Sequence, residues 1–203
     1  AKSKKNYCTF FIVRHGETKL NVEGLVQGHS IDSSLTEEGI KQVKAVAQTL
    51  SKIKFDKIYS SDLLRAVRTA EIIALEHRLA VQTSQLLRER KYGRFEGKPV
   101  ELLKHFNKLF DLMTEDERVH HRVDKDAESD EELVTRFITF LRETAVIYSG
   151  KQILVVSHGG LMRVFLQHIG FWPDKYFSTS RIANAAYVKL LSDGIEFFVE
   201  ETK

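Results

Sequence analysis

The alternation of apolar and polar runs along the chain predicts a parallel sheet packed between helices. Residues 8–13 (CTFFIV) and 152–156 (QILVV) are short apolar runs rich in β-forming residues, as in strands buried on both faces. Residues 57–59 and 80–82 are shorter and weaker strand candidates. Because helical patterns separate these runs, strand should alternate with helix, as in α/β folds.

Three stretches have the apolar spacing of helices that pack on a sheet. The first begins at Thr36, the second near Leu63, and the third runs from about Asp130 to Tyr148, where Gly150 ends it. The positions expected in the core are Ile40, Val43, Ala47 and Leu50 in the first, Leu63, Leu64, Val67, Ala70 and Ile73 in the second, Leu133, Phe137, Phe140, Leu141 and Ala145 in the third, and Phe165 beyond them.

The C-terminal part has the pattern of a β-hairpin. Residues 185–191 and 195–199 flank Asp193-Gly194, a dipeptide typical of tight hairpin turns. We therefore predict a three-layer α/β/α fold whose central sheet is mostly parallel and has an antiparallel edge. Residues 97–129 fit this pattern poorly, since they contain helical turns and an acidic run but no convincing strand. We interpret them as a helical insertion over the active site within one domain, residues 1–203, although a surface excursion has the same composition.

Composition narrows the class of protein. A chain of 203 residues with 42% hydrophobic residues and two prolines can bury a core, which excludes disordered and collagen-like proteins. The one cysteine, Cys8, cannot form an internal disulfide, so we expect a cytoplasmic protein. Arg14 and His15 interrupt the first apolar run too early for a signal peptide, and no run has the roughly 18 apolar residues of a membrane span, so no membrane partner is expected.

The distribution of charged residues along the chain is more informative than the net charge. A net charge of +3 is too small to indicate a nucleic-acid partner. Residues 114–132 carry a net charge of −6, which leaves +9 on the rest of the chain. Most of these cations are expected on solvated helix faces, but the excess is compatible with an anionic ligand.

Two histidines stand in matching contexts, each after a predicted strand and before glycine. Ligands of parallel sheets bind beyond the carboxyl ends of the strands, so His15 and His158 should meet there. A third strand end opens the helix that carries Arg65 and Arg68, and helix N-termini bind anions. A lone strand-end histidine is more often a core residue, but the matched pair favours a site.

Histidines and arginines around one point are typical of phosphoryl transfer. Its transition state spreads negative charge over three oxygens, which guanidinium groups stabilise, and a neutral imidazole can attack phosphorus. No metal site is expected at the adjacent His120 and His121, because their side chains diverge on any regular element and have no spaced acidic or cysteine partner. No cofactor is predicted.

Ordered motifs along nearly the whole chain resemble the histidine phosphatase superfamily, which has the phosphoglycerate-mutase-like fold. They are Arg14-His15-Gly16-Glu17-Thr18 with Asn21, Leu35-Thr36-Glu37-Glu38-Gly39, Ser60-Ser61-Asp62-Leu63-Leu64-Arg65-Ala66, Leu87-Arg88-Glu89 with Gly93 and Glu96-Gly97, and Ser157-His158-Gly159. The resemblance implies that His15 is the nucleophile and that Glu89 is the proton donor and then the base for water. It also implies that the phosphoryl group is held by Arg14, Arg65 and His158, with Asn21, the Gly159 N–H and the Gln27-Gly28 turn completing the shell. The role of Glu89 rests on the resemblance alone, because a glutamate among basic residues is more often a surface ion-pair partner.

The resemblance implies a metal-independent phosphatase that acts on small phosphorylated metabolites through a phosphohistidine. A cofactor-dependent phosphoglycerate mutase would use the same residues, but Glu96-Gly97 resembles the phosphatases. A non-catalytic phospho-ligand-binding module would normally lack the nucleophile or the acid. The basic segment 86–98 is similar to that of fructose-2,6-bisphosphatase-like phosphatases, and its extra cations predict a preference for sugar bisphosphates. The sequence predicts no oligomeric state.

Overall fold

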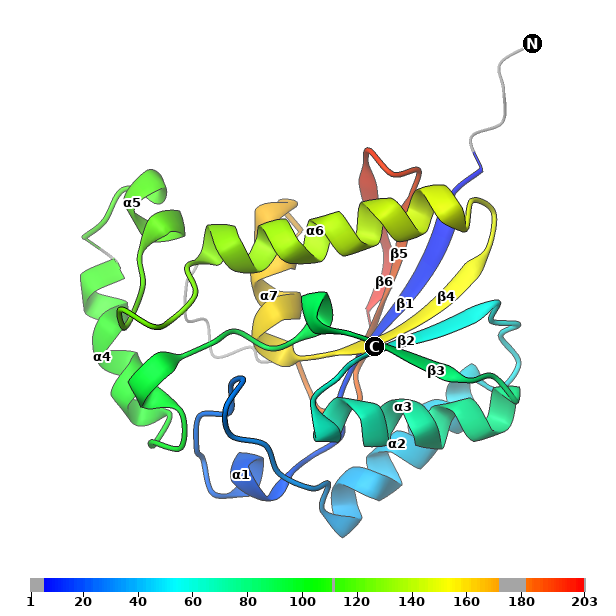
Figure 1. The fold of residues 1–203 in the computed structure, drawn as a ribbon, viewed down its shortest axis with the longest axis horizontal. Coiled ribbons are helices and arrows are strands. Elements are labelled where there is room, and N and C mark those ends of the chain that lie inside the picture. The colour runs from blue at the N-terminus through cyan, green and yellow to red at the C-terminus, as the bar shows by residue number, and fades with distance from the viewer. Residues whose placement is uncertain (1–5, 111, 172–181, 203) are drawn as a thin grey trace.

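A single six-stranded sheet organises the chain, in the order β3-β2-β4-β1-β5-β6 (Figure 1). The computed structural model describes residues 6–110, 112–171 and 182–202. Neighbouring strands are parallel from β3 through β2 and β4 to β1, whereas β5 and β6 are antiparallel. The predicted mostly parallel sheet with an antiparallel edge is therefore confirmed. The strands are β1 (Cys8–Arg14), β2 (Lys57–Ser61), β3 (Val81–Ser84), β4 (Gln152–Ser157), β5 (Tyr187–Ser192) and β6 (Phe197–Thr202).

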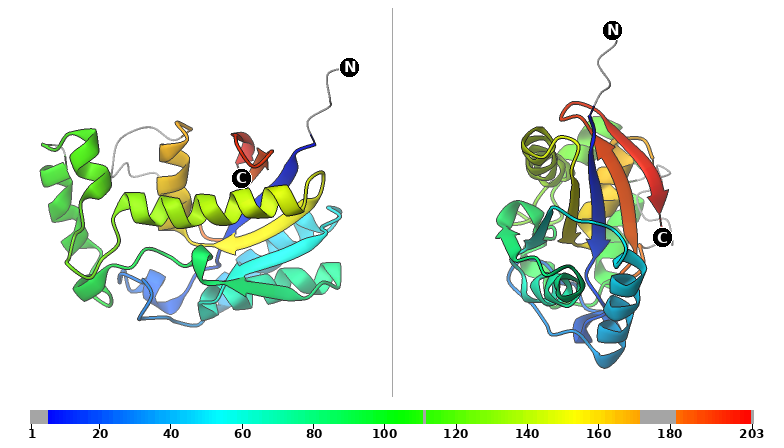
Figure 2. Two further views of the ribbon diagram at one scale, coloured as in Figure 1. Left: turned by 45° about the horizontal axis from the view of Figure 1, so that its top comes forward. Right: turned by 90° about the vertical axis from the view of Figure 1, so that its right-hand side faces the viewer.

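Helices cover both faces of the sheet (Figure 2). Helices α2 (Glu37–Leu50) and α3 (Leu64–His77) pack on one face, and α6 (Asp130–Ile147) and α7 (Gly159–His168) pack on the other. Successive side chains of a strand point to opposite faces, so Phe11 and Val13 of β1 meet the first layer while Phe10 and Ile12 meet the second. The predicted three-layer architecture is confirmed.

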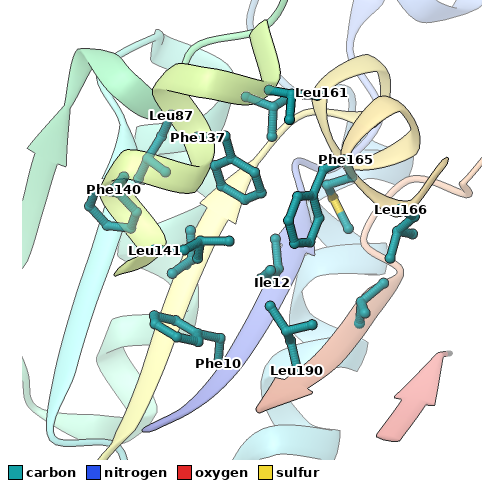
Figure 3. Close-up of a cluster of buried hydrophobic side chains, with 14 of the residues drawn as sticks. Phe10, Ile12, Leu87, Phe137, Phe140, Leu141, Leu161, Phe165, Leu166 and Leu190 are labelled. Atoms are coloured by element: carbon teal, nitrogen blue, oxygen red, sulfur yellow. The ribbon is translucent and has the colours of Figure 1, made fainter. Parts of the chain in front are cut away.

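The layer beneath α6 and α7 is built on aromatic and branched side chains (Figure 3). The rings of Phe137 and Phe165 meet edge to face with their centroids 5.1 Å apart. The α6 and α7 positions predicted for the core are all buried: Leu133, Phe137, Phe140, Leu141, Ala145 and Phe165.

The buried face of α3 differs from the prediction. Leu64 is 58% exposed and Val67 is half-buried, whereas Arg65 and Thr69 are completely buried. The prediction placed the inward face by apolar periodicity alone. In the structure part of that face is polar, because it borders the strand ends where Arg65 and Thr69 find hydrogen-bond partners.

The C-terminal hairpin forms, but its second strand begins later than predicted. The N–H groups of Ile195 and Glu196 donate to the Asp193 carboxylate and belong to the turn. Strand pairing therefore starts at Phe197 rather than at Ile195.

Residues 97–129 contain helices α4 (Glu101–Phe110) and α5 (Glu115–His120), and no strand occurs among the described residues of this stretch. Both helices lie on the side of the sheet to which the carboxyl ends of β1 and β4 point (Figures 1 and 2). A short helix, α1 (Lys19–Val22), follows β1, and 3-10 turns cover Gln85–Leu87 and Gly93–Phe95. Within the described ranges, no helix combines the length and apolar character needed to cross a membrane.

Candidate active site

The two His-Gly turns lie side by side at the carboxyl ends of β1 and β4. Arg14 is paired with Ser157 in the parallel ladder, and the His15 N–H donates to the Ser157 carbonyl oxygen at 3.0 Å. The imidazole rings of His15 and His158 consequently lie with their centroids 5.2 Å apart. Both side chains are almost completely buried.

The hydrogen bonds of His15 define its tautomer. Its Nδ1 lies 2.8 Å from the Gly16 carbonyl oxygen, which can only accept, so Nδ1 carries the proton. In the neutral ring Nε2 then has the free lone pair. Burial, followed by the positive charges of Arg65 and Arg14, lowers the pKa of His15 well below its ordinary value of 6.5. His15 is therefore a neutral imidazole at pH 7 whose Nε2 can act as a nucleophile.

A buried hydroxyl connects the His15 turn to the helix that carries Arg65. The Gly16 N–H donates to Thr69 Oγ1 at 3.1 Å, and this hydroxyl donates to the Arg65 carbonyl oxygen at 2.8 Å. Gly16 thus accepts from the imidazole through its carbonyl group and is held by Thr69 through its N–H. The arrangement fixes the His15 ring relative to α3.

Arg65 is a buried cation with a carboxylate partner. Its Nη1 donates to Asp32 Oδ1 at 2.7 Å and its Nη2 donates to the Gly28 carbonyl oxygen at 3.2 Å. Asp32 also accepts from the Leu64 N–H at the start of α3. A buried charge requires such compensation. The Nε–H of Arg65 has no hydrogen-bond partner among the described residues, so one donor of the guanidinium group can serve a ligand.

His158 is the residue before α7, and its ring is completely buried. Burial, followed by the charge of Arg65 and the neighbouring His15, lowers the pKa of His158 well below 6.5. Neither ring nitrogen has a partner within the described part of the chain. Buried polar groups are normally satisfied, so these nitrogens and Arg65 Nε together suit a ligand with several hydrogen-bond acceptors.

Glu89 lies at the N-terminus of α7. It is 8% exposed, and its carboxylate accepts from the N–H groups of Gly160 and Leu161 at 2.9 Å and of Arg90 at 2.8 Å. A Cβ at position 160 would lie 2.6 Å from Glu89 Oε1, which explains the glycine there. The carboxylate is thus buried and oriented beside the turn of His158, unlike a surface ion-pair partner.

Glycine also permits the approach of Arg14. A Cβ at Gly159 would lie 2.9 Å from Arg14 Nε, so the arginine side chain crosses directly over the first residue of α7. Arg14 also donates through Nη1 to the Ile182 carbonyl oxygen. The guanidinium group and the N-terminus of α7 therefore point to one anion site.

The side-chain amides of Asn21 and Gln27 form hydrogen bonds with other residues of the protein. Asn21 Oδ1 accepts from the Thr18 N–H and from Asn184 Nδ2, and Asn184 also donates to the His15 carbonyl oxygen at 3.1 Å. Gln27 Nε2 donates to Thr18 Oγ1 at 2.8 Å, and its Oε1 accepts from Ser33. These side chains support the loop after β1.

The basic segment after β3 is largely neutralised by carboxylates. Arg88 forms two hydrogen bonds with Asp62, and Arg90 forms a buried ion pair with Asp130. Arg94 lies 3.4 Å from Asp124. Lys91, in contrast, makes no ion pair with any described residue and is half-buried. Of the cations predicted to bind a second phosphate, Lys91 and the exposed Lys98 are the ones not paired with a carboxylate among the described residues.

Several supporting residues were not found from the sequence. Thr69 follows Arg65 by four positions and so shares its helix face, a signal that could have identified it. Asp32 precedes the predicted helix start at Thr36, but nothing in its context indicates an arginine partner. Neither does the sequence indicate that Asn184 contacts His15.

A cavity of about 710 Å³ lies elsewhere, between α5, α6 and α7. Its lining includes Arg118, Glu131, Arg142 and His168 but none of the predicted site residues. The candidate active site is therefore defined by its buried polar groups and not by this cavity.

Comparison with known proteins agrees with the motifs. The family model of the histidine phosphatase superfamily (branch 1) matches residues 10–202. Fructose-2,6-bisphosphatase TIGAR of Xenopus tropicalis is 46% identical over 97 residues, which are 46% of this chain and 35% of that protein. The match to TIGAR thus spans about a third of the relative's length. Phosphoglycerate mutase-like protein 4 of Arabidopsis thaliana is 36% identical over 160 residues, covering 78% of this chain and 69% of the relative.

Solved structures share the fold over nearly their whole length. A phosphoglycerate mutase from Bacillus anthracis has a TM-score of 0.80 and 25% identity, covering 99% of this chain and 95% of its own. A phosphoserine phosphatase from Entamoeba histolytica, in complex with 3-phosphoglyceric acid, has a TM-score of 0.81 and 25% identity, with coverage of 97% and 96%. Since the family model also spans almost all of the chain, the protein belongs to the histidine phosphatase superfamily.

Proposed function

We propose that the chain is a phosphatase that hydrolyses small phosphorylated metabolites through a phosphohistidine at His15. The observation that carries this proposal is the state of His15, a buried neutral imidazole whose Nδ1–H is held by Gly16 and whose Nε2 lone pair is free. Buried cationic and polar groups surround this nucleophile, and a buried carboxylate lies at the N-terminus of α7. This combination suits phosphoryl transfer, in which charge stabilisation and positioning do most of the work.

In the first step, His15 Nε2 attacks phosphorus. The N–P bond forms while the P–O bond to the leaving alcohol breaks, and Glu89, which takes up a proton before this step, donates it to the leaving oxygen. Arg14, Arg65 and His158 bind the phosphoryl oxygens, and the N–H of Gly159 adds a donor from the helix terminus. Each of these groups stabilises negative charge that grows in the transition state.

In the second step, water replaces the alcohol. The Glu89 carboxylate accepts a proton from the attacking water, the O–P bond forms and the N–P bond to His15 breaks. Inorganic phosphate leaves, and both residues return to their starting states. One carboxyl group can serve both steps because each step reverses the proton transfer of the other.

For the substrate, we propose a metabolite with two anionic groups, such as a sugar bisphosphate. The name of the TIGAR relatives supports this choice, and Lys91, which follows Glu89 by two residues, is a cation available for the second group. The other cations near Glu89 are less suited, because Arg88 and Arg90 are already paired with carboxylates.

The test is phosphate release from a panel of sugar monophosphates, sugar bisphosphates and phosphorylated three-carbon acids. The proposal expects stoichiometric inorganic phosphate with the wild type and none with His15→Ala. Transfer of the phosphoryl group between positions of a phosphoglycerate, without release, would identify a mutase. Binding of these compounds without turnover would identify a non-catalytic module, and either result would refute the proposed phosphatase.

A further inference from the structure

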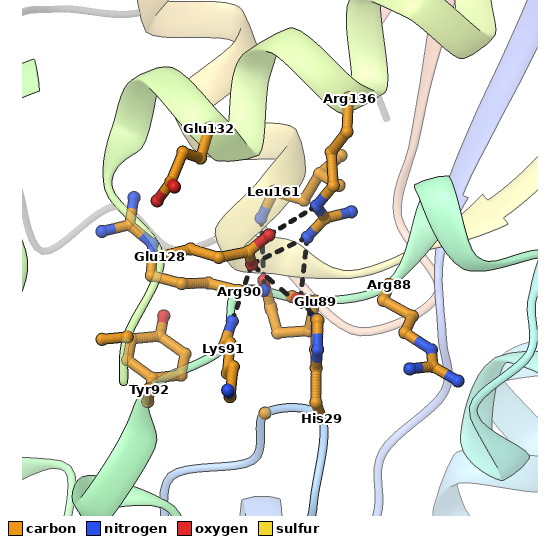
Figure 4. A network of polar contacts seen from close by, with 12 residues as sticks. His29, Arg88, Glu89, Arg90, Lys91, Tyr92, Glu128, Glu132, Arg136 and Leu161 are labelled. Atoms are coloured by element: carbon orange, nitrogen blue, oxygen red, sulfur yellow. Dashed lines mark hydrogen bonds and ion pairs between the residues drawn. The ribbon is translucent and has the colours of Figure 1, made fainter. Parts of the chain in front are cut away.

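An arginine on α6 holds the backbone of the segment that carries Glu89 (Figure 4). Arg136 Nη1 donates to the Leu86 carbonyl oxygen at 2.7 Å, and its Nη2 donates to the carbonyl oxygen of Glu89 itself at 2.9 Å. The arginine thereby ties the 3-10 turn Gln85–Leu87 to the residue Glu89 that follows it. Its guanidinium group donates to main-chain oxygens, and its positive charge contributes to the lowered pKa of His158. Among the described residues no hydrogen bond joins it to a side chain that the proposed mechanism places on the phosphoryl group.

Glu128 holds Arg136 in place and also binds the main chain at Lys91, two residues after Glu89. Its carboxylate accepts from Arg136 Nε at 2.8 Å and Nη2 at 3.1 Å, and from the Lys91 N–H at 2.8 Å. Burial alone would raise the pKa of Glu128, but the bonds from Arg136 and Lys91 outweigh it and lower this pKa. Glu128 is therefore charged at neutral pH and forms a two-point ion pair with Arg136.

A second donor reaches the same carbonyl group from another element. His29 Nε2 lies 2.6 Å from the Glu89 carbonyl oxygen, which can only accept, so Nε2 carries the proton. The Glu89 main chain is consequently held by α6 and by the loop after α1, while its carboxylate is held by the first turn of α7. Glu89 is restrained at both ends by separate elements.

We propose that Arg136 and Glu128 are positioning residues for the proton transfer by Glu89. The inference rests on the proposed function, in which Glu89 donates a proton to the leaving oxygen. A general acid must lie within hydrogen-bond reach of that oxygen, and a displacement of about 1 Å can cost roughly a hundredfold in rate. Loss of the Arg136 clamp frees the Leu86–Lys91 backbone and displaces the carboxylate, without removing any group that contacts the phosphoryl oxygens.

The experiment compares two substrates that differ in their need for an acid. An alkyl phosphate has a poor leaving group that requires protonation, whereas a dinitrophenyl phosphate has a good leaving group that does not. The rate of the first step is measured as the burst of released alcohol in rapid quench, for the wild type, Arg136→Gln, Glu128→Gln and Glu89→Gln. Arg142→Gln, the same change at an exposed position of α6, is the matched control.

The proposal expects the burst with the alkyl phosphate to fall about a hundredfold in Arg136→Gln and by a smaller factor in Glu128→Gln. The burst with the dinitrophenyl phosphate should change by less than about threefold, and Glu89→Gln should show the same selective loss in stronger form. Arg142→Gln should behave as the wild type. Arg136→Lys, which retains the charge, provides the same comparison if Arg136→Gln does not fold.

Equal losses with both substrates in a folded Arg136 variant would show a merely structural role and overturn the inference. Unchanged bursts with both substrates would overturn it as well. In either case a selective loss in Glu89→Gln would leave the proposed function intact. If Glu89→Gln itself reduces both bursts alike, Glu89 is not the acid, and that part of the proposed function fails together with the inference.

Discussion

At the scale of single residues, the chemistry depends on polar groups that the fold buries and constrains. Transfer of an arginine from water to the protein interior is costly, and Asp32 offsets this cost for Arg65 without using all its donors. Burial likewise keeps the two histidines neutral. The site thus combines an uncharged imidazole with fixed positive charge, and water would screen the field of this charge if the site lay at the surface.

The lowered pKa of His15 predicts how its ring responds to pH. A histidine whose pKa in the folded protein lies below that of the unfolded chain remains neutral as the pH falls through 6.5. In that range the unfolded chain binds more protons, so the free energy of unfolding should decrease as the pH falls. An NMR titration, with His15→Ala for assignment, should show no protonation of His15 between pH 8 and about 6.5. A midpoint at or above 6.5 would contradict the buried neutral state.

The hydroxyl of Thr69 should be needed to orient His15. Thr69→Val keeps the shape of the side chain but leaves the buried Gly16 N–H without its acceptor, which should cost about 1–3 kcal/mol in the free energy of unfolding. We expect phosphate release to fall roughly tenfold, because the Gly16 carbonyl group that accepts from His15 Nδ1 is held less firmly. Thr69→Ser retains the hydroxyl and should remain close to the wild type. Equal activity of the Val and Ser variants would show that the hydroxyl has no part in orientation.

At the scale of elements, a capping box starts α6 and orders the residues before it. Ser129 Oγ accepts from the Glu132 N–H at 3.2 Å, while the Glu132 carboxylate accepts from the Ser129 N–H at 3.0 Å. The two flanking carboxylates, Glu128 and Asp130, pair with Arg136 and Arg90. The helix start is therefore also the support of the segment that carries Glu89.

Removing this cap should destabilise the protein measurably. Ser129→Ala is expected to lower the free energy of unfolding by about 1 kcal/mol, the usual value of a serine N-cap. Urea denaturation measures the change, with Ser149→Ala as the control, since Ser149 is exposed and caps no helix. An equal decrease in the free energy of unfolding for the two substitutions would show that the capping box of α6 does not stabilise the protein.

Local sequence signals predicted most elements but not the polar side of α3. Apolar runs identify β1 and β4 because both faces of a central parallel strand are buried. Gly150, with a φ of 76°, lies in the turn that follows α6, as expected. Apolar periodicity could not place Arg65 and Thr69 inward, since their burial depends on partners distant in the sequence. The pairing of Asp32 with Arg65 could not be predicted for the same reason, since the two residues are distant in the sequence.

At the scale of the whole molecule, the site is assembled where the parallel strands end. His15 follows β1, His158 follows β4 and Arg65 lies on the helix after β2. Matched His-Gly motifs predict this meeting point, because the carboxyl ends of parallel strands share one edge. The role proposed for Glu89 has only the family resemblance behind it at the level of sequence, because the hydrogen bonds to its carboxylate come from α7, distant in the sequence.

Substrate choice belongs to this scale, because it depends on charge outside the phosphoryl site. Lys91→Ala should reduce kcat/KM for a sugar bisphosphate roughly fivefold and leave the matching monophosphate unchanged, as expected for about 1 kcal/mol from a half-buried charged contact. Lys44→Ala, which removes an exposed cation on α2, is the control. Equal effects on both substrates would remove Lys91 from substrate recognition.

The central claim is that His15 carries the phosphoryl group during turnover, and its most direct test is to trap that intermediate. The wild type and Glu89→Gln are mixed with a dinitrophenyl phosphate, whose leaving group needs no acid, so that Glu89→Gln slows only the second step. Both reactions are quenched in base and analysed by peptide mass spectrometry. We predict phosphate on the peptide that contains His15, stable in base and lost in acid, and no such label in His15→Ala. Phosphate on another residue, or turnover with no trapped intermediate in either protein, would contradict the account.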